Sequence, residues 1–201
     1  MYMNNLDEKF QIETGNRGAS KKRADGDHHY EATPYPFINA LFNEYELDEG
    51  THFVDFGSGK GRLLFYVHHR FHCRVKGVEK DEQLHKIALK NRKAYVEQSG
   101  TLENEILLFN QGAENYQVHD EDNVFYFFNP FSLLIFNEVV QNILTTWQNN
   151  RRQIQLIFYY PREKYLNALK KTSFTLEREV LIPGISRMNK EERFLIYTLD
   201  G

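Results

Sequence analysis

The stretch VDFGSGKGR, residues 54–62, decides which fold this chain adopts. Apolar residues lead into Asp55 and are typical of a buried strand, whereas the residues after Arg62 have the spacing of a helix. Between them lie Gly57, Gly59 and Gly61, and glycine allows both a sharp turn and a close approach to the main chain. The stretch therefore predicts a strand, a tight turn that contacts a ligand, and a helix.

Three kinds of ligand-binding loop compete for this turn. A triphosphate-binding loop needs Ser or Thr after Gly-Lys, but Gly61 follows Lys60 here. The dinucleotide pattern G-x-G-x-x-G needs a glycine where Arg62 stands, which weakens that interpretation without excluding it. The remaining pattern is acidic-x-G-x-G-x-G, which Asp55 and the three glycines match.

Apolar patterns on both sides of the turn alternate between strands and helices. The predicted strands span residues 52–56, 74–79, 105–110, 123–129, 154–160, 174–182 and 193–199, and the predicted helices span residues 33–45, 61–71, 81–98, 133–148 and 162–171. This alternation predicts an α/β three-layer sandwich whose sheet is mostly parallel. The last two strands have no helix between them, so we expect a seven-stranded sheet with an antiparallel last strand.

Composition limits the classes of protein that fit. The chain has 201 residues and a formal net charge of −3, which is too small to indicate a nucleic-acid or membrane partner. No apolar run approaches the ~18 residues of a membrane span, and Cys73 is the only cysteine, which favours a reducing, cytoplasmic location. Residues 1–30 contain few apolar residues and predict a mobile arm, which could order over a ligand, ahead of one domain at residues 31–201.

Asp55, Gly57, Ser58, Gly59 and Gly61 form a turn that resembles the first motif of the class I S-adenosylmethionine-dependent methyltransferases. The resemblance covers residues 33–200 and implies that family's Rossmann-like fold and S-adenosylmethionine as the cofactor. It places Asp55 near the ammonium group of the cofactor. DFGSGKGR and GVEK are also similar to the non-SET lysine methyltransferases of histones, a similarity of cofactor motifs that does not identify the acceptor.

Further motifs of the resemblance follow the next two predicted strands. Glu79 lies at the end of the second strand, roughly 20 residues after the glycines, where a carboxylate binds ribose hydroxyls. Gly112, Ala113 and Glu114 occupy the place of the adenine-contacting loop. Many family members have aspartate where Gly112 stands, so Gln111 or Glu114 would have to supply the acidic or polar contact. The segment around Tyr30, Thr33 and Tyr35 would border the cofactor.

The sequence FFNPF, residues 127–131, follows the fourth predicted strand and resembles the Asn-Pro-Pro-aromatic motif of amino-directed methyltransferases, minus one proline. By that resemblance Asn129 accepts a hydrogen bond from the acceptor nitrogen and borders the cofactor. Pro130 shapes the loop, and Phe131 packs on the acceptor or the cofactor. Asn-Pro is also a common turn dipeptide, so a structural role for the motif stays open.

Two functions of different classes remain. The first is an S-adenosylmethionine-dependent methyltransferase acting on a nitrogen of a protein, nucleobase or small amine. The second is a non-catalytic Rossmann-like module that binds S-adenosylmethionine or a dinucleotide. His68, His72 and Cys73 suggest a metal site, but the glutamate of H-E-x-x-H is absent, and we predict no metal. Residues 101–150, which hold the FFNPF motif, are acidic and disfavour a long polyanion, whereas residues 151–201 are net basic; on balance we expect a protein or small cationic acceptor.

Overall fold

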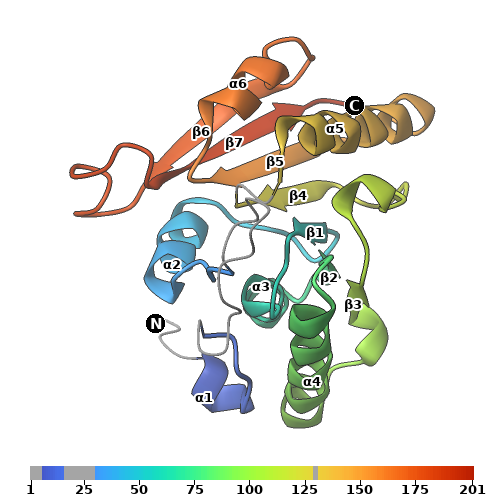
Figure 1. Ribbon diagram of the computed structural model, residues 1–201, viewed down its shortest axis with the longest axis vertical. Helices are drawn as coiled ribbons and strands as arrows, with labels where there is room; N and C mark the ends of the chain where they lie inside the picture. The colour runs from blue at the N-terminus through green and yellow to red at the C-terminus, as the bar shows by residue number, and fades with distance from the viewer. Residues whose placement is uncertain (1–5, 16–29, 129–130) are drawn as a thin grey trace.

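The computed structural model describes residues 6–15, 30–128 and 131–201. Its centre is one seven-stranded sheet in the order β3-β2-β1-β4-β5-β7-β6, with helices on both faces (Figure 1). The strands are β1 His52–Phe56, β2 Arg74–Val78, β3 Ile106–Phe109, β4 Val124–Phe127, β5 Ile154–Tyr159, β6 Thr175–Leu181 and β7 Arg193–Leu199. The predicted three-layer α/β architecture is confirmed.

The strand directions confirm the predicted reversal at the end of the chain. β1 pairs in parallel with β2 and β4, and β4 pairs in parallel with β5. β7 lies antiparallel between β5 and β6. The two final strands therefore form a hairpin in which the second strand, β7, pairs with the parallel part of the sheet and β6 forms the edge.

The helices are α1 Leu6–Phe10, α2 Tyr35–Glu44, α3 Arg62–Phe71, α4 Glu82–Ser99, α5 Leu133–Asn149 and α6 Glu163–Leu169, with short 3₁₀ turns η1 Glu103–Glu105 and η2 Ala113–Asn115. Asp81 begins α4, because its Oδ1 accepts hydrogen bonds from the backbone N–H groups of Gln83 at 2.8 Å and Leu84 at 3.1 Å. These bonds satisfy donors that the first turn of a helix leaves free.

Two clusters of buried side chains hold the helices on the sheet. Alternate strand residues such as Phe53 and Tyr126 pack with α2, α3 and α4, whereas Val54 and Phe125 pack with α5 and α6. Strands buried on both faces read as continuous apolar runs, which is why the central strands were recognisable in the sequence.

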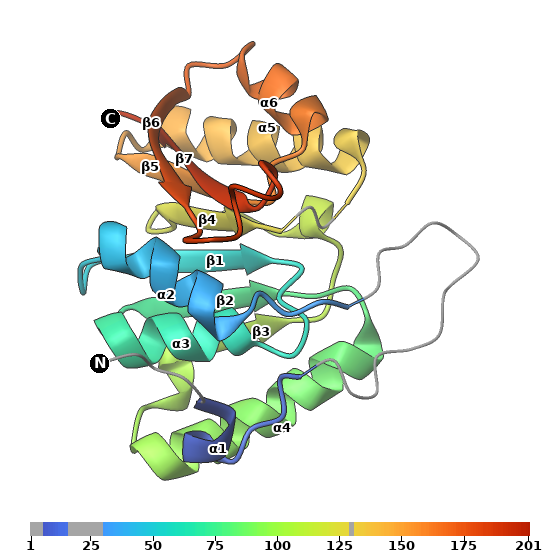
Figure 2. The ribbon, with the colours of Figure 1, turned by 90° about the vertical axis from the view of Figure 1, so that its left-hand side faces the viewer.

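The N-terminal segment differs from the predicted mobile arm. Leu6 and Phe10 of α1 are buried, and the Phe10 ring lies 4.6 Å from the ring of Tyr95 in α4. Figure 2 shows α1 against α4, far from the strand ends of β5 to β7. Although apolar residues are few in this segment, Leu6, Phe10 and Ile12 are spaced so that each is buried against the first cluster. The rest of the predicted arm, residues 1–5 and 16–29, lies outside the described residues.

Among the described residues, no helix is both long and apolar enough to cross a membrane.

Candidate functional site

The glycine turn connects two adjacent strand ends. Phe56 at the end of β1 pairs with Val78 at the end of β2, and the N–H of Gly57 donates to the Val78 carbonyl at 2.9 Å. Gly57, Gly59 and Gly61 have φ values of 79°, 54° and 88°. These left-handed values strain any residue with a Cβ. The three glycines are therefore required by the turn itself, as the sequence predicted.

Glu79 follows β2 and lies against this turn. Its Oε2 accepts from the Gly59 N–H at 2.9 Å, and its Oε1 accepts from the Asp81 N–H at 2.7 Å. Burial raises the pKa of the Glu79 carboxyl, and the two hydrogen bonds oppose that shift. A carboxylate oxygen has two lone pairs, so both oxygens can still accept from the hydroxyls of a ribose.

Asp55 and Ser58 lie on the other side of the turn, at a small cavity of about 30 Å³ that Thr33, Tyr126 and Phe128 also line. Asp55 is 5% exposed, and burial together with the Glu79 charge raises its pKa to about 8. The Ser58 hydroxyl is buried without a hydrogen-bond partner among the described residues. A buried acid beside an unsatisfied hydroxyl fits the ammonium group of an amino-acid ligand, which would pair with the acid.

Tyr30 closes the turn from the outside. A Cβ on Gly59 would lie 2.2 Å from Cε2 of the Tyr30 ring, so the ring packs directly on the glycine backbone. The Tyr30 hydroxyl donates to the Thr14 carbonyl at 2.8 Å. Thr33 also reaches the cavity, where its hydroxyl lies 2.9 Å from the Tyr126 hydroxyl. Tyr35 instead hydrogen-bonds Asp7 through its hydroxyl, so only two of the three residues predicted to border the cofactor line the cavity.

The loop that the sequence predicts to contact the adenine has no space for an aspartate at position 112. Ala113 begins η2 and is buried, and a Cβ on Gly112 would lie 2.4 Å from Oε1 of Glu114. The Glu114 carboxylate therefore occupies the space that a side chain at position 112 would fill. Asn110 joins this loop to the acid at the neighbouring strand end, because its Nδ2 donates to the Glu79 carbonyl at 2.8 Å. This loop therefore has its acid at Glu114, two residues after Gly112, the position at which many family members have aspartate.

The acceptor end of the site is only partly described. Asn129 and Pro130 lie outside the described residues. The Phe131 ring lies 6.4 Å from Phe56 and 6.2 Å from Phe127, so it packs in the second core cluster. Phe128 instead faces the cavity and lies 4.5 Å from the ring of Tyr159.

Two polar residues that were not among the predicted site residues fix the N-terminal segment on the site. Arg62 donates from Nε to the Thr14 hydroxyl at 2.8 Å and lines the cavity. Asn91 accepts from the Glu13 N–H at 2.9 Å and donates to the Glu13 and Lys60 carbonyls, both at 3.0 Å. Their partners are backbone groups or hydroxyls far away in sequence, so no local pattern identifies them.

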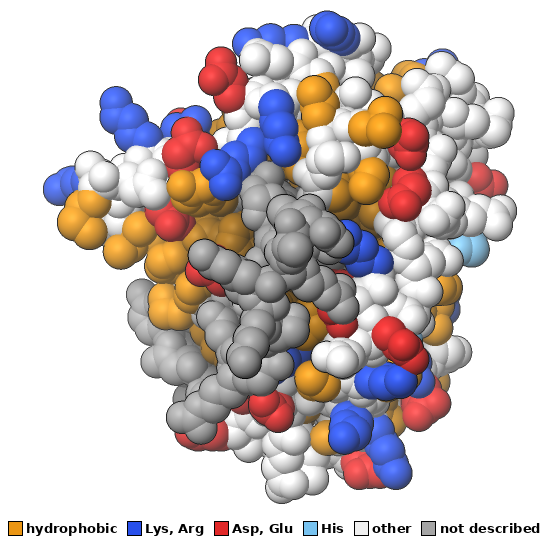
Figure 3. Space-filling view, in the orientation of Figure 1, with side chains coloured by type: hydrophobic (Ala, Val, Ile, Leu, Met, Phe, Trp, Pro, Cys, Tyr) orange, Lys and Arg blue, Asp and Glu red, His pale blue; other side chains and the backbone are white. Residues whose placement is uncertain are grey.

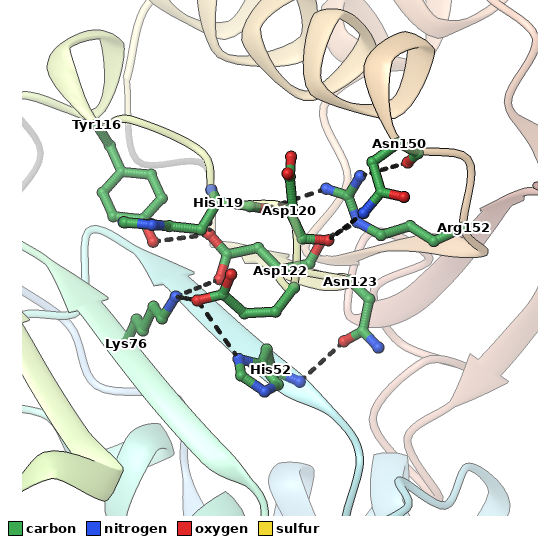
Figure 4. A network of polar contacts seen from close by, with 10 residues as sticks. His52, Lys76, Tyr116, His119, Asp120, Asp122, Asn123, Asn150 and Arg152 are labelled. Carbon is green, nitrogen blue, oxygen red and sulfur yellow. Dashed lines mark hydrogen bonds and ion pairs between the residues drawn. The ribbon is translucent and has the colours of Figure 1, made fainter.

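A polar cluster lies at the opposite, amino end of the sheet (Figure 4). His52, Glu121 and Asp122 bring potential metal-ligand atoms within 4.8 Å of one another. The ammonium of Lys76 already lies 2.6 Å from Asp122 Oδ1 and 3.0 Å from Glu121 Oε1. The other oxygen of Asp122, Oδ2, accepts from the Tyr116 hydroxyl at 2.8 Å. This cluster pairs its own charges and fixes the chain that follows η2.

The histidines considered as metal ligands are separate in the structure. His68 is buried, with Nδ1 at 2.8 Å from the Tyr95 hydroxyl and Nε2 at 3.2 Å from Glu105. His72 is exposed and ends α3 with a left-handed backbone. The His68 side chain therefore hydrogen-bonds Tyr95 and Glu105 and not the His72 side chain.

The sheet with its reversed last strand, the glycine turn after β1 and the acid after β2 define a Rossmann-like S-adenosylmethionine-dependent methyltransferase. The particular family within this class is also established. The family model described as "Histone methylation protein DOT1" matches residues 12–146, and the chain belongs to this family. It is a class I methyltransferase family, and the cofactor is S-adenosylmethionine.

Solved structures share the fold. An RNA methyltransferase from Salinibacter ruber in complex with S-adenosyl-L-homocysteine has a TM-score of 0.56 and 18% identity, covering 85% of this chain and 93% of that chain. An rRNA methylase from Streptococcus thermophilus also has a TM-score of 0.56, with 16% identity and coverage of 81% and 94%. No curated protein matches the chain significantly in sequence.

Proposed function

We propose that this methyltransferase transfers the methyl group to an amine nitrogen, on a protein side chain or a small cationic molecule. Bound S-adenosylmethionine supplies the electrophilic methyl group. Asp55 and Ser58 bind the ammonium end of the cofactor, and Glu79 accepts hydrogen bonds from the ribose hydroxyls. Gly112, Ala113 and Glu114 border the adenine. The chain's part in catalysis is to hold an acceptor nitrogen in line, which by proximity alone supplies up to ~7–11 kcal/mol.

Asn129, Pro130 and Phe131 are proposed to orient the acceptor. Their motif follows β4, whose residues Tyr126 and Phe127 pair with Asp55 and Phe56 of β1. The motif therefore begins at the carboxyl end of β4, beside the carboxyl end of β1 where the proposed cofactor residues lie. The catalytic proposal depends on this placement. The side-chain oxygen of Asn129 would accept from an acceptor N–H and direct the lone pair of that nitrogen.

The lining beside the cavity supports an amine as the acceptor. Phe128 lines the cavity, and behind it the buried Tyr159 ring lies 4.5 Å from Phe128 and 6.1 Å from Phe37. Burial raises the pKa of Tyr159, and the charges of Glu192 and Glu31 raise it further. Aromatic faces together with carboxylates attract cations. The description of the family as histone methylation proteins also favours a protein amine over a nucleobase.

Methyl-tritiated S-adenosylmethionine tests the proposal. The protein is incubated with core histones, with unfractionated tRNA and with spermidine, and the label in each acceptor is counted. Label in histones or spermidine, lost in Asn129→Ala, supports an amine acceptor and the role of Asn129. Label in tRNA alone overturns the amine acceptor. Binding of S-adenosylhomocysteine without transfer to any acceptor favours the non-catalytic module.

We also infer that transfer proceeds without a bound metal and that the protein works in the cytoplasm. The ammonium of Lys76 pairs with both Glu121 and Asp122 and occupies the space between them and a would-be metal, which supports the first inference. The free Cys73 is buried, and burial raises the pKa of its thiol to about 12. A thiol held in its protonated form is compatible with a reducing compartment.

A further inference from the structure

Tyr160 has a backbone conformation that its position does not explain. Its φ is 51°, in the left-handed region. Among the described residues, the other non-glycine residues with positive φ are Gln11 and His72, which follow α1 and α3. Left-handed residues are common at helix ends. Tyr160 instead follows the strand β5 and precedes Pro161, where an extended backbone is usual.

Contacts on both sides hold Tyr160 in this conformation. Its N–H donates to the Arg193 carbonyl at 3.1 Å, and the neighbouring Pro161 is buried. The guanidinium of Arg162 lies 5.0 Å from the centre of the Tyr160 ring, and the Tyr159 ring lies 6.4 Å away, edge to face. Strained residues persist only where the surrounding structure fixes them, and they concentrate at functional sites.

The position of Tyr160 connects it to the cofactor cavity. Phe127 of β4 pairs with Phe158 of β5, so the two strands end side by side. Phe128 lines the cavity and contacts Tyr159, which in turn contacts Tyr160. The rings of Phe128, Tyr159 and Tyr160 therefore form a continuous aromatic wall from the cavity, in which Tyr159 is buried and the two outer rings are partly exposed. Figure 3 shows hydrophobic side chains beside the hairpin of β6 and β7.

The Tyr160 ring stands at the outer end of this wall, with the Arg162 guanidinium near it. It is partly buried against the first core cluster, like Phe37, Phe128 and Ile185, and part of its surface is exposed. These four side chains come from α2 and from the segments after β4, β5 and β6. A partly exposed aromatic ring among apolar neighbours suits the carbon stem of an amine. The ammonium group of that amine would then be directed toward Glu192 and Glu31, the carboxylates that act on Tyr159.

We propose that Tyr160 is an acceptor-binding residue, whose ring contacts the carbon stem of the amine and whose left-handed backbone keeps the ring at the end of the aromatic wall. The inference rests on the proposed amine acceptor. The acceptor would then be bound by Tyr160, which follows β5, in addition to the FFNPF motif, which follows β4. S-adenosylmethionine itself is bound by residues after β1, β2 and β3, so Tyr160 should affect the acceptor and not the cofactor.

Three variants test this assignment: Tyr160→Gly removes the ring, Tyr160→Phe keeps it, and His72→Gly is the matched control. His72 has the same left-handed φ but lies at the amino end of the sheet. Tyr160→Gly is expected to raise the KM for spermidine or core histones at least tenfold. The dissociation constant of S-adenosylhomocysteine should change less than twofold. Tyr160→Phe and His72→Gly should leave both constants near those of the unsubstituted protein.

A binding measurement without turnover completes the test. The protein is labelled with 3-fluorotyrosine, and the ¹⁹F resonance absent from Tyr160→Phe belongs to Tyr160. With S-adenosylhomocysteine bound, n-butylammonium should shift that resonance. An unchanged KM in Tyr160→Gly, or a Tyr160 resonance that n-butylammonium does not move, overturns the assignment. Failure of S-adenosylhomocysteine to bind, or label in tRNA alone, would instead contradict the proposed function.

Discussion

The Glu79 carboxylate accepts a hydrogen bond from the backbone N–H of Gly59 at 2.9 Å. The acid at one strand end thus fixes the shape of the glycine turn at the neighbouring strand end. The same side chain holds the turn and is proposed to bind the ribose, so we expect the cofactor site to depend on this contact.

Substitution of Glu79 tests that dependence. Glu79→Gln keeps the size of the side chain but replaces one accepting oxygen with an NH₂ group that faces a backbone N–H. Hydrogen bonds to charged groups contribute ~1.5–3 kcal/mol, so we expect affinity for S-adenosylhomocysteine to fall about 10- to 100-fold in calorimetry. Glu82→Gln, an exposed acid at the start of α4, is the control and should bind normally. Equal affinity in Glu79→Gln would remove Glu79 from the site.

Gly59→Ala tests the contact with Tyr30. Alanine adds the strain of a left-handed backbone, ~1–2 kcal/mol, and its Cβ would also meet the Tyr30 ring. Gly100→Ala is the matched control, because Gly100 has φ 72° and nothing within 4 Å of the added Cβ. In denaturant unfolding, Gly59→Ala should destabilise the protein more than Gly100→Ala does. Equal losses of stability would show that the ring does not pack on the turn.

The raised pKa of Asp55 should make the free energy of unfolding depend on pH. Burial and the Glu79 charge raise its pKa to about 8, above that of an unfolded carboxyl. The folded state therefore holds a proton that the unfolded chain releases, and stability from this group is present at low pH and is lost as pH rises through about 8. Asp55→Asn should flatten that decline in thermal unfolding measured from pH 5 to pH 9. A variant whose decline matches the unsubstituted protein would contradict the raised pKa.

Cofactor binding should also release protons through Asp55. An ammonium beside the carboxyl favours its ionised form, so binding near pH 7 should release a proton and strengthen as pH rises toward about 8. Calorimetry of S-adenosylhomocysteine in two buffers of different ionisation enthalpy measures this release directly. Proton release that persists in Asp55→Asn would assign it to another group.

The Lys76–Asp122 ion pair should be structural. Both side chains are buried, and removing one leaves a buried charge unpaired. We expect Lys76→Met to lower the free energy of unfolding by ~3–5 kcal/mol, whereas Lys86→Met, which removes a partner of an exposed pair, should leave it nearly unchanged. Denaturant titration of both variants checks the difference. If Lys76→Met were as stable as Lys86→Met, the amino-end cluster would not support the fold.

The fold was predictable because its elements carry local signals. The glycines with positive φ, the apolar central strands and the Asp81 helix cap each fit a pattern of a few residues. The insertion of β7 between β5 and β6 was less visible, since strand order depends on pairing between distant segments.

The sequence predicted the site residues that lie at the ends of adjacent strands. It did not predict contacts between segments that are distant in the sequence. Asp55, Gly59 and Glu79 could be brought together from the sheet alone. The packing of α1 on α4 could not, because it depends on three apolar residues in a polar segment. The strained Tyr160 has no sequence signal apart from Pro161, and its backbone partner, the carbonyl of Arg193, comes from the distant strand β7.

The most direct test of the cofactor site is a crystal structure of the protein grown with S-adenosylhomocysteine. We predict density for the ribose within hydrogen-bonding distance of the Glu79 carboxylate, with the ammonium group at Asp55 and the main chain of Gly57 to Gly61 against the ligand. Ribose density elsewhere, with Glu79 still bound only to Gly59 and Asp81, would contradict it.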